Sequence, residues 1–241
     1  MTRIILDNAE LDKKTVSILG QDSAHVCLSL RMRQGETLTV CDGKGKDALC
    51  VIDKTTPERT DCTILEIKPS PAELCSRVFI YQCLPKGDKL EFILQKTTEL
   101  GVCGIVPVLS DRCISRPDER SFAKKLKRYR DICKEAAQQC GRGVIPTVSD
   151  LVDFKTAVSS LPDNATNVFC YEKERDRTLR SVLSSARSDI NVFIGAEGGF
   201  SDNEKELADK NGLIFVTFGQ RILRCETAPV YVMSAVSYEL S

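Results

Sequence analysis

Hydrophobic and polar positions alternate differently in the first part of this chain and in the remainder. Up to about residue 70 the apolar runs are short and follow a period of two, which is typical of strands with one buried face. Such runs lie at 37–41, 48–52 and 61–67, and turn residues Asp42-Gly-Lys-Gly45 separate the first two. A short helix is predicted at 25–33. This part predicts a small antiparallel β domain such as a barrel.

After residue 70 the pattern changes to apolar strands that alternate with helices. Strands are predicted at 77–83, 104–109, 168–171, 191–195 and 213–219. Helices are predicted at 88–100, 121–140, 201–212 and from Thr227 onward. The alternation is typical of a mostly parallel sheet covered by helices.

Local signals refine these boundaries. Asp88–Glu91 and Ser201–Glu204 have the spacing of capping boxes, in which side chains satisfy the first backbone N–H groups of a helix. The proline-containing segment 68–71 has the composition of a linker. We therefore expect two domains, 1–70 and 71–241.

Composition and charge narrow the class of protein. The 241 residues are 42% hydrophobic and 28% charged, with 34 basic and 34 acidic side chains, as in an ordinary globular protein. No apolar run is long enough to span a membrane, and the N-terminus lacks a signal-peptide pattern, so we expect a cytoplasmic protein without a membrane partner. The twelve cysteines include no C-x-x-C pair, and His25 is the single histidine, which favours reduced, structural thiols and no metal site.

A glycine-rich loop follows the predicted strand at 191–195. Gly195-Ala-Glu-Gly-Gly-Phe-Ser201 places three glycines and one carboxylate between that strand and a capped helix. It is either a tight turn or a backbone cradle for a ligand, since glycine allows close approach. It matches neither the dinucleotide-binding nor the phosphate-loop pattern.

A charged loop follows the next strand, in Phe218-Gly-Gln-Arg-Ile-Leu-Arg-Cys-Glu-Thr-Ala228. Arg221, Arg224 and Glu226 stand between an apolar strand and an apolar helix, so they need either one another or a polar ligand. Ligands of open α/β sheets bind beyond the strands' carboxyl ends, and we expect both loops to share one pocket. Arg224 beside Cys225 suggests a depressed thiol pKa, although nothing else indicates a nucleophile.

Positive charge is concentrated in 112–142, with ten basic against four acidic residues. A solvated helix surface is one interpretation of such a run. The local excess favours an anionic partner such as RNA.

Both loops resemble the paired signatures of the RsmE family, methyltransferases that act on uridine N3 in small-subunit (16S) ribosomal RNA. Further matching blocks, which extend the resemblance over nearly the whole chain, are His25 to Gly35, Asp42–Gly45, Lys86–Val102 and Glu135–Arg142. The resemblance implies a PUA-like small β-barrel that docks RNA and a SPOUT α/β domain with a parallel sheet and a C-terminal trefoil knot. It also implies S-adenosylmethionine as cofactor, a homodimer, and rRNA within the assembled subunit as substrate. One departure is Ala196, where the family usually has proline.

The resemblance and the charge pattern together assign candidate residues. Arg224 or Arg221 is the candidate catalytic cation for the charge that develops on uracil, with Glu226 orienting the arginine. The positions implied for cofactor binding are Tyr171, Glu172, Gly195, Glu197, Gly198, Gly199, Phe218, Gly219, Ile222, Leu223, Arg224 and Thr227. The RNA-binding candidates are Arg3, Arg31, Arg112, Lys124, Lys127, Arg128 and Arg142.

Two other functions compete with this interpretation. A non-catalytic RNA-binding ribosome-assembly factor would share the fold, but the intact loops argue against it. An enzyme of another class would use a phosphorylated small molecule, but the chain lacks a phosphate-loop pattern and carries the basic segment. Failure to bind S-adenosylmethionine would revive both alternatives.

Overall fold

A computed structural model describes residues 2–6, 9–185 and 189–240 of the chain. The chain forms two compact units. Unit 1 comprises Met1–Glu73 and Ala137–Ile145, and unit 2 comprises Leu74–Ala136 and Pro146–Ser241. The segment Ala137–Ile145 therefore packs with the N-terminal residues, whereas the sequence pattern places it in the second domain.

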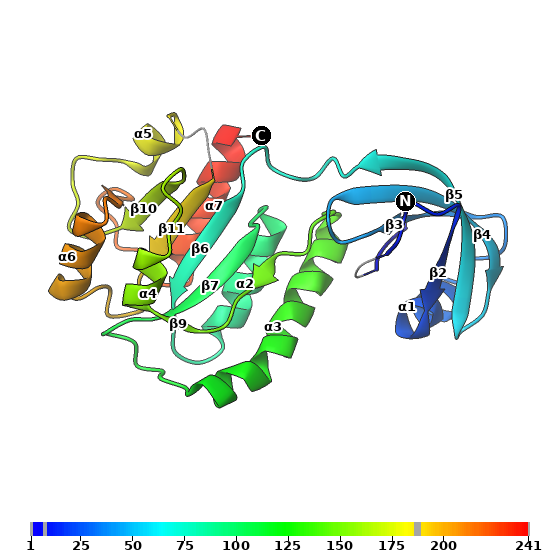
Figure 1. Cartoon of the computed structure of the whole chain (residues 1–241), viewed down its shortest axis with the longest axis horizontal. Helices are drawn as coiled ribbons and strands as arrows, with labels where there is room; N and C mark the ends of the chain where they lie inside the picture. Colours follow the sequence, from blue (N-terminus) through cyan, green and yellow to red (C-terminus); the bar gives the residue numbers. More distant parts are fainter. Residues whose placement is uncertain (1, 7–8, 186–188, 241) are drawn as a thin grey trace. The chain divides into compact units, whose positions relative to one another are not determined.

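Unit 1 is built on one sheet with the strand order β1-β3-β4-β5-β2 (Figure 1). The pairs among β3, β4 and β5 are antiparallel, which confirms the prediction for that part of the sheet. The sequence pattern did not predict β1, which pairs parallel with β3, or β2, which pairs antiparallel with β5. The strands are β1 (Arg3–Ile5), β2 (Thr15–Leu19), β3 (Thr37–Cys41), β4 (Lys46–Thr55) and β5 (Arg59–Pro69).

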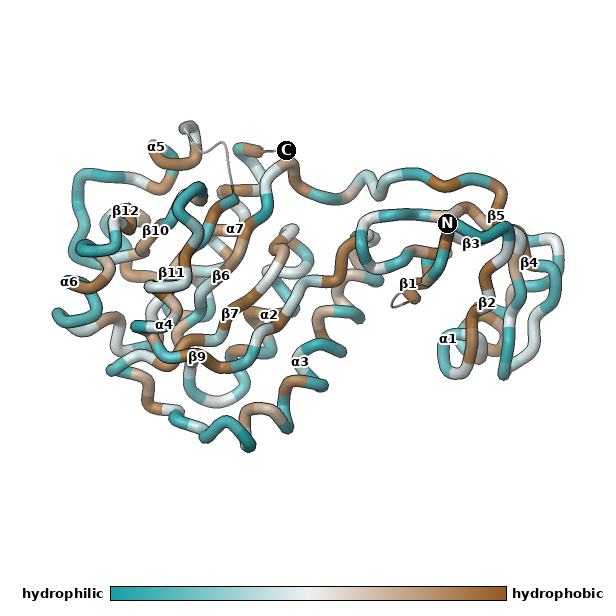
Figure 2. The backbone as a smooth tube through the Cα atoms, viewed as in Figure 1, coloured by the Kyte–Doolittle hydropathy of each residue, from teal (hydrophilic) through white to brown (hydrophobic). Residues whose placement is uncertain are grey.

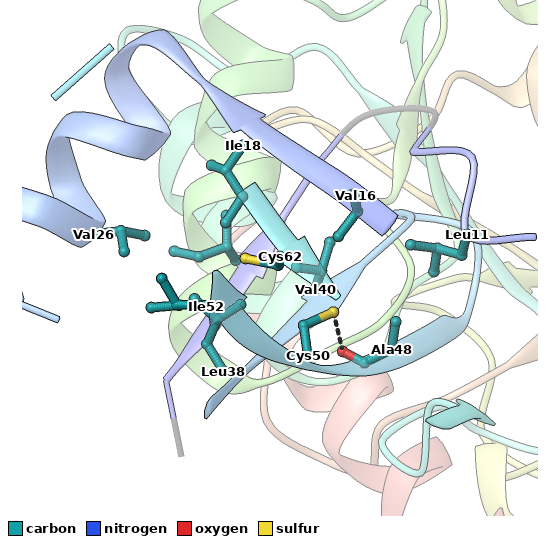
Figure 3. Packing of buried hydrophobic residues seen from close by; sticks show 11 residues of the cluster. Leu11, Val16, Ile18, Val26, Leu38, Val40, Ala48, Cys50, Ile52 and Cys62 are labelled. Carbon is teal, nitrogen blue, oxygen red and sulfur yellow. Dashed lines mark hydrogen bonds between the residues drawn. The ribbon is translucent and has the colours of Figure 1, made fainter. Parts of the chain in front are cut away.

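The period-two pattern of these strands sends one set of side chains into a common core (Figure 3). Leu38 and Val40 of β3 are fully buried, as are the thiols Cys50 and Cys62 of the next two strands. Cys50 Sγ donates to the Ala48 carbonyl at 3.4 Å, and burial raises the pKa of Cys50 to about 11. These thiols are therefore protonated and pack as small apolar side chains.

The predicted helix at 25–33 is wrong at both ends. Helix α1 (Gly20–Ala24) begins earlier and continues directly into a π-helical turn, η1 (His25–Ser29). Arg31 has a φ of 54°, in the left-handed region that L-residues seldom adopt, so helical geometry cannot continue through it. Val26 of this segment is buried, and Met32 packs against the same core.

Unit 2 contains a parallel sheet with the order β12-β10-β11-β6-β7-β8, in which β9 also pairs with β7. The strands are β6 (Val78–Cys83), β7 (Gly104–Leu109), β8 (Thr147–Val148), β9 (Val152–Asp153), β10 (Thr166–Cys170), β11 (Ile190–Ile194) and β12 (Ile214–Val216). The helices are α2 (Lys89–Glu99), α3 (Glu119–Cys140, whose last turn belongs to unit 1), α4 (Phe154–Ser159), α5 (Leu179–Leu183), α6 (Asp202–Lys210) and α7 (Thr227–Leu240). The predicted parallel sheet with helical layers is confirmed.

Helices cover the sheet, with α4 in front of it and α7 behind it in Figure 1. Helix α7 packs against α2 and α5, and α4 packs against α6. Every residue of β11 is buried, and its Phe193 stacks on Tyr81 at 4.5 Å between ring centroids. Phe154 of α4 meets the edge of the same Phe193 ring at 5.9 Å. Burial on both faces explains why the central strands are continuous apolar runs, whereas α3 alternates between hydrophilic and hydrophobic residues (Figure 2).

The two predicted capping boxes have different outcomes. At α6 the box is present, since Ser201 Oγ accepts from the Glu204 N–H at 3.2 Å and the Glu204 carboxylate accepts from the Ser201 N–H at 2.8 Å. At α2 the Asp88 side chain caps no backbone group. Glu91 instead accepts from Arg128 Nε at 2.6 Å, so the ion pair replaces the box.

Over the described ranges, no helix is both long and apolar enough to cross a membrane.

Candidate functional site

Three adjacent parallel strands of unit 2, β11, β10 and β12, end at the same edge of the sheet, and a cavity of about 550 Å³ opens there. The glycine-rich loop after β11 and the charged loop after β12 both line it, so the prediction of a shared pocket is confirmed. Its volume is in the range of pockets for small molecules and cofactors. The residues that line it are Lys89, Cys170 to Glu172, Arg175, Ile194 to Phe200, Val216 to Cys225 and Ala228.

The glycine-rich loop is a tight turn that also forms a wall of the cavity. The Gly199 N–H donates to the Ala196 carbonyl at 2.9 Å, which closes the turn, and Gly199 has a φ of +64°. A Cβ on Gly195 would lie 3.0 Å from the Gly199 Cα, so a side chain there would displace backbone. The turn is therefore tight and the loop lines the cavity, while its role as a cradle for a ligand stays a prediction.

The segment that follows β7 supports this loop from outside the cavity. Arg112 Nη1 donates to the Gly198 carbonyl at 2.9 Å, and Ser201 Oγ donates to Asp111 Oδ2 at 2.6 Å. A Cβ on Gly198 would lie 3.0 Å from the Arg112 Cβ, so the two segments are in close contact. Arg112, a candidate for RNA binding, therefore lies against the glycine-rich loop.

The charged loop presents two cations at the cavity. Arg221 and Arg224 are exposed and line the cavity, and within the described part of the chain neither forms an ion pair. The carboxylate of Glu226 accepts from Cys225 Sγ at 3.1 Å and lies 3.3 Å from Lys89 Nζ. The arrangement of Glu226 orienting an arginine is thus absent from this structure, as is the alternative in which an Arg–Glu pair only braces the loop.

Lys89, at the start of α2, is a site residue that sequence reasoning did not assign. Its Nζ donates to Glu197 Oε1 at 2.8 Å and approaches Glu226 Oε2 at 3.3 Å, so one ammonium group joins both loops. The hydrogen bond that Lys89 donates to Glu197 raises the pKa of Lys89, and Glu226 adds to the effect. Burial alone would raise the pKa of Glu197, but hydrogen bonds from Lys89 and the Lys86 N–H lower it. Lys89 lies in the block Lys86–Val102, and the resemblance of this block to the family was the one sequence signal that could have pointed to Lys89.

The expected depressed pKa of Cys225 is wrong. Burial, together with the neighbouring Glu226 carboxylate, raises the pKa of this thiol to about 12. The hydrogen bond from Cys225 Sγ lowers the pKa of Glu226 in turn. The thiol is consequently protonated at neutral pH, which gives no support to a nucleophilic role.

The residues implied for cofactor binding come together with one exception. Thr227 begins α7 and is not among the residues lining the cavity. The other implied positions all line it: Tyr171, Glu172, Gly195, Glu197, Gly198, Gly199, Phe218, Gly219, Ile222, Leu223 and Arg224. Arg175 lines it too, with Nη1 donating to the Glu172 carbonyl at 2.9 Å, and no sequence motif pointed to it.

The remaining RNA-binding candidates are divided by their partners. Arg3 pairs with Asp47 at 2.7 Å, and Arg142, which is 2% exposed, pairs with Glu73 at 2.7 Å. These two arginines brace unit 1, which accounts for them without RNA. Arg128 pairs with Glu91 but remains largely exposed. Three other RNA-binding candidates, Arg31, Lys124 and Lys127, are exposed. RNA binding by these residues stays a prediction.

No cluster of three or more metal-ligating side chains occurs among the residues that the structure describes.

Comparison with known proteins gives two family models that together cover most of the chain. Residues 72–237 match an RNA methyltransferase domain, and residues 18–65 match an RNA methyltransferase PUA domain. The ribosomal RNA small subunit methyltransferase E of Bacillus subtilis is 33% identical over 93% of this chain and 90% of its own length.

Solved structures resemble the whole chain. The ribosomal RNA small subunit methyltransferase E of Neisseria gonorrhoeae, bound to S-adenosyl methionine, is 30% identical, with a TM-score of 0.83 over 99% of this chain and 97% of that one. A Legionella pneumophila structure in complex with the bound cofactor SAM is 28% identical, with a TM-score of 0.85 over 99% of this chain and 98% of that one.

Proposed function

Because this chain belongs to the ribosomal RNA small subunit methyltransferase E family, we propose that it methylates N3 of one uridine in small-subunit (16S) rRNA. The broader activity is that of an S-adenosylmethionine-dependent rRNA methyltransferase. The N3 position and the choice of a single uridine are the proposed part. They rest on the resemblance of both loops to the family signatures and on the chemistry available at the cavity.

The cavity suits S-adenosylmethionine, which is part apolar and part charged. A Cβ on Gly195 or on Gly198 would lie 3.0 Å from a neighbouring atom, so glycine at these positions lets the loop that lines the cavity pack closely. The carboxylate of Glu172 lies near Gly199, and its Oε2 is 3.5 Å from the position that a Cβ on Gly199 would take. The two loops, with Tyr171 and Glu172, would hold the cofactor, and the cofactor supplies an activated methyl group.

The residues of the chain have to prepare the uracil for this transfer. N3 carries a proton and becomes nucleophilic only when the proton leaves, which places negative charge on the neighbouring oxygens. Arg221 and Arg224 are exposed at the cavity, and neither forms an ion pair in the described ranges. Cations placed beforehand where charge develops stabilise the transition state, and we assign that role to Arg224 or Arg221. A target base inside an RNA helix would have to leave the stack first.

The observation that carries the proposal is that Arg221 and Arg224, which form no ion pair among the described residues, line the same cavity as the glycine-rich loop. Its test is methyl transfer from labelled S-adenosylmethionine to small ribosomal subunits that lack the modification, followed by nucleoside separation. We expect the label in 3-methyluridine. Label in another nucleoside would overturn the N3 assignment, and no label with intact cofactor binding would overturn the RNA target.

Replacing Arg224 separates its role from that of the fold. We expect Arg224→Ala to lower kcat by about 100-fold or more, because removing one electrostatic stabiliser of a transition state costs that much. Lys210→Ala, an exposed lysine on α6 that is outside the cavity, is the matched control and should leave kcat unchanged. Turnover of Arg224→Ala at the wild-type rate would exclude Arg224 as that stabiliser.

Further features belong to the same proposal. Unit 1 docks RNA, as the match to a PUA domain of RNA methyltransferases supports. The working form is a cytoplasmic homodimer, in keeping with the exposed Phe92, Tyr231 and Tyr238 on α2 and α7. The C-terminal trefoil knot also stays a prediction, as do the division into 1–70 and 71–241 and rRNA within the assembled subunit as substrate.

A further inference from the structure

One ammonium group connects three segments that are distant in sequence. Lys89 Nζ lies 2.8 Å from Glu197 of the glycine-rich loop and 3.3 Å from Glu226 of the charged loop. The backbone N–H of Lys86 also donates to Glu197 Oε1, at 3.2 Å. The start of α2 therefore holds both loops that line the cavity.

The electrostatic reason for this arrangement is the presence of two carboxylates near one point. Glu197 and Glu226 come from different loops, yet both lie within 3.3 Å of the same nitrogen. Their side chains are 28% and 21% exposed, so water screens them only in part. Without the ammonium group the carboxylates would repel each other, and the repulsion would act to separate the loops.

We propose that Lys89 is a positioning residue that fixes the two cavity loops in the cofactor-binding arrangement by bridging Glu197 and Glu226. The proposal rests on the proposed function, since it concerns the same cavity. An isolated exposed ion pair contributes little to stability, but this bridge sets the distance between two ligand-binding loops. Its effect therefore lies in cofactor affinity more than in unfolding.

The test compares substitutions on one helix by calorimetric titration with S-adenosylmethionine in the absence of RNA. Lys89→Met keeps the length of the side chain and removes its charge, and we expect the Kd to rise about tenfold, as for other coupled sites. Lys96→Met is a matched control, because Lys96 is equally exposed and pairs at the same 2.8 Å, but with Glu99 of its own helix. We expect its Kd to equal that of the wild type.

A second substitution distinguishes repulsion from a simple loss of contact. If the carboxylates repel in Lys89→Met, then adding Glu226→Gln should restore affinity to within about threefold of Glu226→Gln alone, a non-additivity typical of directly coupled groups. A merely structural lysine would give additive effects. Additive losses, or wild-type affinity in Lys89→Met, would overturn the proposal.

Folding and function are controlled separately. Circular dichroism and the Tm report whether each variant folds. If Lys89→Met does not fold, the variant Glu226→Gln alone tests the proposal. Loss of the contact between Lys89 and Glu226 should raise the Kd for S-adenosylmethionine about threefold. An unchanged Kd would overturn the proposal. Failure of the wild-type chain to bind S-adenosylmethionine would contradict the proposed function instead, so the two failures are distinguishable.

Discussion

Side chains of the same charge at the cavity have opposite environments. Lys89 is neutralised by two carboxylates, whereas Arg221 and Arg224 form no ion pair among the described residues. The paired cation organises the loops, and the unpaired cations remain available to an anionic ligand such as an RNA phosphate or an ionised base.

The thiol beside these groups allows a prediction about reactivity and pH. Because the pKa of Cys225 is raised to about 12, its proton is lost only in strongly alkaline solution, and the thiolate that alkylating reagents need is scarce at neutral pH. We expect iodoacetamide, applied to the native protein near pH 8, to modify the exposed Cys75 and to leave Cys225 unmodified, as mapped by peptide mass spectrometry. Labelling in denaturant is the control and should modify both. Rapid native labelling of Cys225 would contradict the raised pKa.

Among the elements, helix α6 shows how a cap also serves the site. Ser201 begins this helix and Glu204 completes the capping box, while Ser201 Oγ also donates to Asp111 in the segment after β7. The same residue therefore ends the glycine-rich loop, starts a helix and joins a neighbouring segment.

Removing this hydroxyl should weaken the helix start. We expect Ser201→Ala to lower the free energy of unfolding by about 1 kcal/mol, the usual effect of losing an N-cap. Urea titration followed by circular dichroism measures it. Ser201→Thr retains the hydroxyl and should lose less than half as much. Equal losses in both variants would show that the hydroxyl is not responsible.

Periodicity predicted the long elements and missed the short ones. The runs at 37–41 and 104–109 match β3 and β7 residue for residue. An alternating or continuous apolar run of that length is typical of a strand. Strands β8 and β9, with two residues each, have no period that a pattern could reveal. The helix predicted at 25–33 was displaced because apolar spacing cannot anticipate the positive φ of Arg31.

At the cavity, sequence reasoning found what is contiguous and missed what comes from elsewhere in the chain. Both loops could be recognised from their own letters, and they do line one cavity. The partner of Glu226 could not be recognised in this way, because Lys89 is more than a hundred residues away in the sequence. The sequence next to Glu226 offers only the neighbouring arginines as partners. Likewise the basic residues Arg3 and Arg142 looked like RNA ligands, although tertiary structure gives them internal carboxylates.

At the scale of the whole molecule, unit 1 depends on a segment that arrives late in the sequence. Glu73 accepts from Arg142 Nη2 at 2.7 Å and from the N–H groups of Gly143 and Val144 at 2.9 and 3.0 Å. Ala137 and Ile145 pack with Ile5 and Cys41 in a small apolar cluster. This segment is thus held by both polar and apolar contacts.

Neutralising Glu73 should therefore destabilise unit 1. Glu73→Gln removes the negative charge that pairs with the guanidinium of Arg142, whose side chain is 3% exposed, and we expect a loss of about 3 kcal/mol in the free energy of unfolding. Glu66→Gln is the matched control, since its pair with Lys68 is exposed and should contribute at most about 0.5 kcal/mol. Urea titration of both variants measures the difference. Similar losses in the two would contradict a structural role for the buried pair.

The same interruption of unit 1 has a consequence for how the protein is made. Translation delivers Met1–Glu73 first, then residues 74–136 of the other unit, and only afterwards the segment that completes the first. Glu73 and Arg142, which form a hydrogen bond, are 69 positions apart in the sequence. The N-terminal sheet is therefore synthesised before Arg142, and part of unit 2 is synthesised between them. Unit 1 cannot be finished before unit 2 has begun, and a nascent chain halted between the two would lack the small cluster that Ala137 and Ile145 form with Ile5 and Cys41.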